Sequence, residues 1–311
     1  MLKRLLFGFH LLVLGVFLAG HSKLSAAAGP TPRVEISSIR VVGGGWGSAD
    51  LGDIRQVLNL VARQFVAAFG DRAPPPIQVL HRFGTPQVLY DLSPEGEFVV
   101  ALTARNERWY QYTYQFSHEL CHVLSRFERK GRGAEIVRQN QWFEESLCET
   151  ASLYALRRLA ADWAAEPLSA RFPGAGLVFG EYADELISQP HRRLPEGVTF
   201  PSWFAANRDA LRDEPYQREK NELVAAVLLP LFESDPHSWA SLAFLNAKEH
   251  AQTTTFEGYL DAWRSASPAG LQPFVSRIED TFGIRARAAN GAPAPKSRST
   301  RLPVAEPANG N

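Results

Sequence analysis

Two histidines lie four residues apart in the stretch FSHELCHVLSRF (116–127), and a glutamate directly follows the first of them. In a helix each residue turns by about 100°, so His118 and His122 would project from one face, about 40° apart. Their ring nitrogens can then share a metal ion, with Glu119 turned roughly 80° from the midline of that face. Two neutral imidazoles beside a general base are the groups that metal-assisted hydrolysis needs.

A second segment, WFEESLCETASLY (142–154), offers the third ligand that a site with two histidines requires. An acidic first turn of a helix, which the helix dipole favours, explains Glu144 without any metal. Glu145 and Glu149 are like charges four residues apart, which an isolated helix disfavours and a metal site would favour. We expect Glu145 to bind the metal and Glu149 to accept a hydrogen bond from a ligand histidine. Glu144 is the alternative third ligand.

Ligation by two histidines and one glutamate favours zinc, with one ion per chain and the fourth position left to water. Glu119 would act as the general base that takes a proton from the attacking water. Two other interpretations stay open. One is a catalytically silent metal-binding protein of the same fold that serves as a partner-binding module, although such a protein has no need of Glu119. The other is a helical protein in which the His-Glu-x-x-His spacing is accidental, as it is in roughly one chain in a hundred.

Together the two segments resemble the gluzincin metallopeptidases, the group that contains the thermolysin-like enzymes and the zinc aminopeptidases. Trp142 precedes Glu145 by three residues, which is the spacing of the aminopeptidase branch, and Glu149 follows it by four, as in the thermolysin branch. The resemblance implies a zincin-like fold and the hydrolysis of peptide bonds in a peptide or protein substrate.

A third segment, EPYQREKNELVAAVLLPLFE (214–233), is similar to the aminopeptidase helix whose leading tyrosine hydrogen-bonds the oxyanion of the reaction intermediate. The resemblance assigns that role to Tyr216, with Tyr182 as the second candidate. Met1 is the only methionine, so the G-x-M-E-N segment with which aminopeptidases anchor the substrate amine is missing. The stretch EFVVALTARN (97–106) is then expected to form the edge strand of the cleft and to pair with substrate. Endopeptidase and exopeptidase activity both remain open.

The pattern along the chain predicts an α+β fold. A small mixed β-sheet lobe, about 33–130, would carry the motif helix, and an α-helical lobe, about 135–284, would follow, with the active-site cleft between them. The motif helix is expected over about 107–130 and the second ligand-bearing helix over about 140–164. Together the lobes form one domain over 29–284, followed by a small, Pro-rich and polar tail over 285–311 that we expect to be disordered.

The 311 residues include 33 basic and 33 acidic side chains, so the formal net charge is zero and nucleic acid is not an expected partner. The first 28 residues have the charged, apolar and small-residue order of a secretory signal. Their apolar run is shorter than the roughly 20 residues of a membrane helix, so no stable membrane insertion is expected after cleavage. We therefore expect an exported protein, periplasmic or secreted; an uncleaved anchor is the alternative.

The only two cysteines, Cys121 and Cys148, each lie three residues after a proposed metal ligand. In an oxidising compartment an even number of cysteines permits a disulfide, which here would join the two ligand-bearing helices. The other interpretation is two small buried side chains, and the sequence leaves both open.

Overall fold

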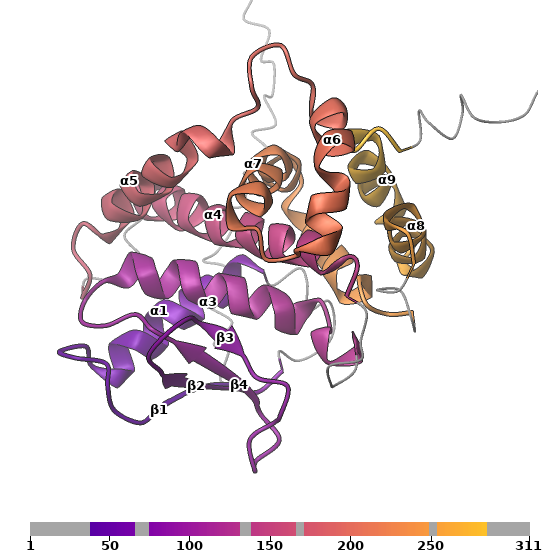
Figure 1. Ribbon diagram of the computed structural model, residues 1–311. Coiled ribbons are helices and arrows are strands. Elements are labelled where there is room, and N and C mark those ends of the chain that lie inside the picture. Colours follow the sequence, from indigo (N-terminus) through magenta and orange to yellow (C-terminus); the bar gives the residue numbers. More distant parts are fainter. Residues whose placement is uncertain (1–37, 66–74, 131–137, 166–170, 249–253, 285–311) are drawn as a thin grey trace, which may run out of the picture. The chain divides into compact units, whose positions relative to one another are not determined.

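The computed structural model describes residues 38–65, 75–130, 138–165, 171–248 and 254–284 (Figure 1). All of them belong to one compact unit, Glu35–Asn311. The predicted signal (1–28) and the predicted disordered tail (285–311) lie outside the described residues. Among the described helices, none is both long and apolar enough to cross a membrane.

The sheet has four strands in the order β1-β2-β4-β3. Three of them run parallel, and the short β3 is antiparallel to β4, with Val88 opposite Val100. The bounds are β1 Ile39–Val42, β2 Ile77–His81, β3 Gln87–Val88 and β4 Phe98–Leu102. The expectation that 97–106 forms the edge of the sheet is wrong, because β4 lies between β2 and β3. Its continuous apolar run is typical of an interior parallel strand, and Val100 is fully buried.

Two helices pack against this sheet. Helix α1 (Leu51–Gln64) follows β1, and Asp50 caps it by accepting hydrogen bonds from the backbone N–H groups of Gly52 and Asp53. Helix α3 (Trp109–Leu124) contacts β3 and β4, and Figure 1 shows it between the sheet and the remaining helices. It ends six residues before the predicted boundary, because the chain turns at Arg126, whose φ of 61° lies in the left-handed region. A 3₁₀ helix, η1 (Phe127–Lys130), follows this turn.

Beyond η1 the described part of the chain contains helices and no strands, so the fold is α+β as predicted. Helix α4 (Gln141–Ala165) packs against α3, α5 and α7 and is buried on most of its surface. This burial explains why its apolar residues show no single stripe. The other elements are α5 Ala175–Ser188, η2 Pro190–Arg192, α6 Phe200–Asp213, α7 Arg218–Ser234, η3 Pro236–Phe244, α8 Phe256–Ala266 and α9 Gln272–Thr281.

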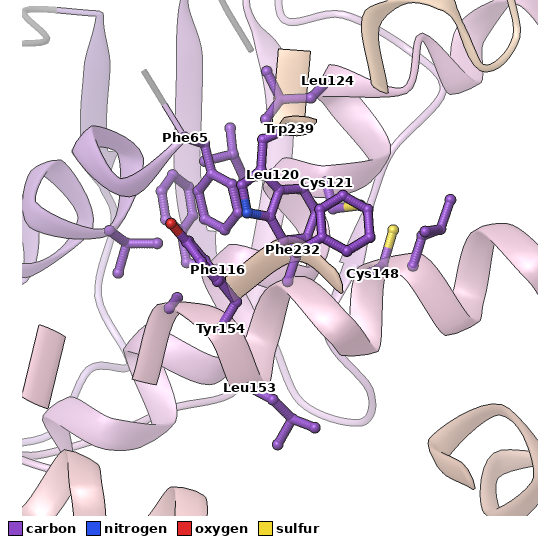
Figure 2. Close-up of a cluster of buried hydrophobic side chains, with 14 of the residues drawn as sticks. Phe65, Phe116, Leu120, Cys121, Leu124, Cys148, Leu153, Tyr154, Phe232 and Trp239 are labelled. Carbon is purple, nitrogen blue, oxygen red and sulfur yellow. The ribbon is translucent and has the colours of Figure 1, made fainter. Parts of the chain in front are cut away.

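A close-packed core joins α3 to α4 and fixes how the two helices face each other (Figure 2). The ring of Phe232 stacks on Trp239 with centroids 4.0 Å apart, and Phe65 meets the same tryptophan edge-on at 5.0 Å. Cys121 and Cys148 lie in this core as buried free thiols. Burial, and then a hydrogen bond with the Cys121 thiol, raises the pKa of Cys148 well above its usual value. In the structure the two cysteines are therefore small buried side chains without a disulfide between them.

Candidate metal centre

His118, His122 and Glu145 come together at the contact between α3 and the first turns of α4. Oε2 of Glu145 lies 3.3 Å from Nε2 of His118 and 3.7 Å from Nε2 of His122. Each residue offers one donor atom, and the three atoms lie within 4.8 Å of one another. A tetrahedral ion with bonds of about 2.0–2.1 Å separates its ligand atoms by roughly 3.3 Å. The two distances from Glu145 to the histidines are close to this value, so the three side chains fit a zinc ion in donor type and approach its spacing.

The charges around the site hold Glu145 and His122 in their ionised forms. Burial alone would raise the pKa of Glu145, but the charge of His122 and hydrogen bonds from both histidines lower it well below the usual range. Glu145 is thus held as a carboxylate. Burial lowers the pKa of His122, yet the carboxylates of Glu145 and Glu144 outweigh it, and the net shift is well upward. Metal binding would therefore release protons from the histidines.

Glu144 is completely buried and contacts the other nitrogen of the second histidine. Its Oε1 lies 2.8 Å from Nδ1 of His122, and because a carboxylate only accepts, Nδ1 carries the proton. Once the proton on Nε2 of His122 is released, this nitrogen can bind a metal through its lone pair. Oε2 of Glu144 accepts a hydrogen bond from Asn246 at 2.9 Å. Burial raises the pKa of Glu144, but the charge of Lys130 and the hydrogen bond from His122 bring it down to about 2.

Glu149 has different partners from those expected. The Tyr114 hydroxyl donates a hydrogen bond to its Oε2, and Arg192 forms an ion pair with its Oε1 at 2.8 Å. Arg192 also lies 3.2 Å from Glu222 on α7, so one buried guanidinium links α4 to α7. Within the described residues, the carboxylate hydrogen-bonded to Nδ1 of a ligand histidine is that of Glu144. The position that orients a histidine is thus one residue before the proposed ligand rather than four after it.

Glu119 lines the same cavity as His118 and Glu145 and is 4% exposed. Burial raises the pKa of its carboxyl group, while the charges of His118 and His122 and a backbone hydrogen bond from Val88 oppose the shift. A carboxyl with a raised pKa is better matched to proton transfer near neutral pH than an ordinary surface glutamate. Val88 belongs to β3, so the edge strand itself helps to place this side chain.

A cavity of about 310 Å³ adjoins the three donor atoms, and two of the residues that supply them, His118 and Glu145, line it. Its walls come from the segment before β3, from α3, from α4 and from the start of α7. The lining residues are Thr85, Pro86, Tyr114, Gln115, His118, Glu119, Glu145, Glu149, Tyr216, Arg218, Asn221 and Glu222. Tyr216 lines this cavity and is 58% exposed. The second candidate, Tyr182, packs instead on the ring of Tyr110, with centroids 4.7 Å apart.

Four residues around the site were not anticipated: Tyr114, Lys130, Gln141 and Arg192. The positions of two of them could have been predicted from helical spacing. Tyr114 precedes His118 by four residues, and Gln141 precedes Glu145 by four, so each lies on the ligand face of its helix. Lys130 and Arg192 reach the site only through the packing of separate segments.

A comparison with protein-family models finds no match to this chain, and a comparison with curated proteins finds none either.

Proposed function

We propose that this chain is an exported, zinc-dependent metallopeptidase with a zincin-like fold, similar to the gluzincins. The observation that carries the proposal is the cluster of three donor atoms within 4.8 Å of one another, next to a cavity that the buried Glu119 also lines. Neither feature alone requires catalysis. A silent metal-binding module would need the three ligands but has no use for Glu119 at the same cavity wall.

His118, His122 and Glu145 would hold the zinc ion. Bound there, the ion would supply Lewis acidity, polarising a substrate carbonyl and lowering the pKa of water to about 7. Glu119 would accept a proton from the attacking water and then deliver it to the leaving amine. Its burial supports this role, because a carboxylate held away from bulk solvent exchanges its proton with the reacting groups.

Tyr216 would donate a hydrogen bond to the oxyanion that develops on the substrate carbonyl. Its position at the cavity wall, just before α7, supports this assignment. An extended peptide would lie along β3, the edge strand, since Thr85 and Pro86 directly before that strand line the same cavity. The substrate is therefore a peptide segment in extended conformation.

The test is a peptide library incubated with the purified, zinc-loaded chain and analysed by mass spectrometry. The parent protein should cut peptides, and Glu119→Gln should retain zinc while its turnover falls by roughly 10²–10⁴-fold. Glu95→Gln, in the turn before β4, is the matched control and should cut like the parent. Turnover of Glu119→Gln at the parent rate would refute the assigned base. A fully loaded parent that cuts nothing would favour the silent binding module.

A further inference from the structure

Lys130 is a buried cation at the edge of the candidate metal centre. It is the last residue of η1, and the turn at Arg126 directs this short helix away from the axis of α3. Its side chain is 2% exposed. The ammonium group donates one hydrogen bond to Oε1 of Glu144 at 2.8 Å and another to Oε1 of Gln141 at 2.7 Å. Both acceptors lie in the first turn of α4.

Each of these acceptors in turn contacts one proposed metal ligand. Oε1 of Glu144 accepts the Nδ1 proton of His122 at 2.8 Å. Nε2 of Gln141 donates to Oε1 of Glu145 at 2.7 Å. That bond engages one carboxylate oxygen of Glu145 and leaves Oε2, the oxygen that faces both histidines, for a metal. A single lysine is thus two hydrogen bonds away from two of the three ligands.

The bond from Lys130 also determines which way the Gln141 amide points. An ammonium group has three donors and no acceptor, so it can contact only the oxygen end of the amide. The NH₂ end must then face Glu145. With the amide turned over, its oxygen would oppose the carboxylate of Glu145, and the ligand would lose the donor that holds it.

We propose that Lys130 is a positioning residue of the metal centre, setting His122 through Glu144 and Glu145 through Gln141. The inference rests on the metal site of the proposed function. The competing explanation is that Lys130 only neutralises the buried charge of Glu144. In that case its contact with Gln141 would be incidental, and zinc affinity would not depend on it once Glu144 is neutral.

The experiment compares Glu144→Gln with the double variant Lys130→Met/Glu144→Gln, which removes both buried charges together and leaves no unpaired ion. Zinc affinity is measured by competition with a chelator, and the cobalt-substituted proteins are compared by their visible absorption spectra. Thermal unfolding of the zinc-free proteins checks that both fold. Gln141→Met removes only the connection from Lys130 through Gln141 to Glu145. Arg264→Met, which removes the partner of Glu279 between α8 and α9, is the control for loss of a partly buried ion pair.

Relative to Glu144→Gln, the double variant should bind zinc 10–100-fold more weakly, the usual cost of losing a group that orients a ligand, and its cobalt spectrum should change. Gln141→Met should show a similar loss relative to the parent, and Arg264→Met none. Equal zinc affinity and equal spectra of the double variant and Glu144→Gln would overturn the inference while leaving the metal site intact. A parent protein that binds no zinc would overturn the proposed function and this inference together.

Discussion

Glu144 and Glu145 are neighbours in the chain, yet they contact opposite nitrogens of one imidazole. Oε1 of Glu144 lies 2.8 Å from Nδ1 of His122, and Oε2 of Glu145 lies 3.7 Å from Nε2 of the same ring. The first carboxylate is completely buried, and the second faces the cavity with its side chain 17% exposed. Two adjacent residues of the same type thus have different surroundings, one holding the ring and the other presenting a carboxylate oxygen beside it.

Removal of the Glu144 carboxylate should weaken the fold itself. In Glu144→Ala the buried ammonium of Lys130 loses its charged partner, and Asn246 loses an acceptor. Breaking a buried ion pair from one side typically costs about 3–5 kcal/mol of the free energy of unfolding. Urea denaturation of the zinc-free protein measures this loss, with Glu95→Ala in an exposed ion pair as the control. A loss below about 1 kcal/mol, the scale of surface pairs, would contradict the buried network.

The two tyrosine candidates for the oxyanion donor should differ in how much kcat falls when the hydroxyl group is removed. Tyr216 lines the cavity, so Tyr216→Phe should lower kcat for peptide cleavage by roughly 10²–10³-fold, the cost of losing one oxyanion donor, with little change in KM. Tyr182 packs on Tyr110 outside the cavity lining, so Tyr182→Phe should leave kcat unchanged. Steady-state kinetics of the two variants decide between them. An unchanged kcat in Tyr216→Phe would remove this residue from the reaction.

Acid should destabilise the contact between α4 and α7 through Glu222. Burial alone would raise the pKa of this carboxyl, but a hydrogen bond from Arg218 and the charge of Arg192 lower it below the usual value. Glu222 therefore contributes stability above its unfolded pKa of about 4.3, and this contribution is lost as the pH falls through its lower folded pKa.

The corresponding measurement is urea denaturation of the parent and Glu222→Gln between pH 3 and pH 7. The parent should be the more stable protein near neutral pH, and the difference should shrink as the pH drops below about 4.3. Glu219→Gln, on the exposed face of the same helix, is the matched control. A difference between the parent and Glu222→Gln that grows in acid would contradict the sign of the pKa shift.

The cysteine pair gives a direct chemical prediction. Because Cys121 and Cys148 are free thiols, protein purified and denatured without reductant should yield two titratable thiols per chain. In the folded protein alkylation should be slow, since both side chains are buried and burial raises the pKa of Cys148. Thiol quantitation before and after denaturation tests this. Absence of thiols after denaturation would show that a disulfide joins α3 to α4.

Local patterns predicted the parts of the site that lie within one helix. The spacing of His118 and His122 identified a shared face of α3, and the acidic stretch identified the first turns of α4. Tyr114 and Gln141 lie four residues before His118 and Glu145, so the same helical spacing could have predicted that they lie near the site. The α+β class followed from strand-like segments confined to the first third of the chain.

Contacts between distant segments could not be predicted in this way. Glu149 pairs with Arg192, which follows it by more than forty residues along the chain, so no helical spacing links the two. Strand β3 (Gln87–Val88) pairs antiparallel with β4 and takes the edge position that was expected for 97–106. Which strand lies at an edge depends on pairing across the sheet, and a single segment does not contain that information.

The most direct test of the central claim is the metal content of the purified chain beside that of Glu145→Ala and Glu149→Ala. Glu145 contributes the third donor atom, whereas Glu149 lines the same cavity but pairs with Tyr114 and Arg192. We expect about one zinc ion per chain in the parent and in Glu149→Ala, and much less in Glu145→Ala. Equal zinc in parent and Glu145→Ala, or no zinc in the parent after reconstitution, would contradict the proposed centre.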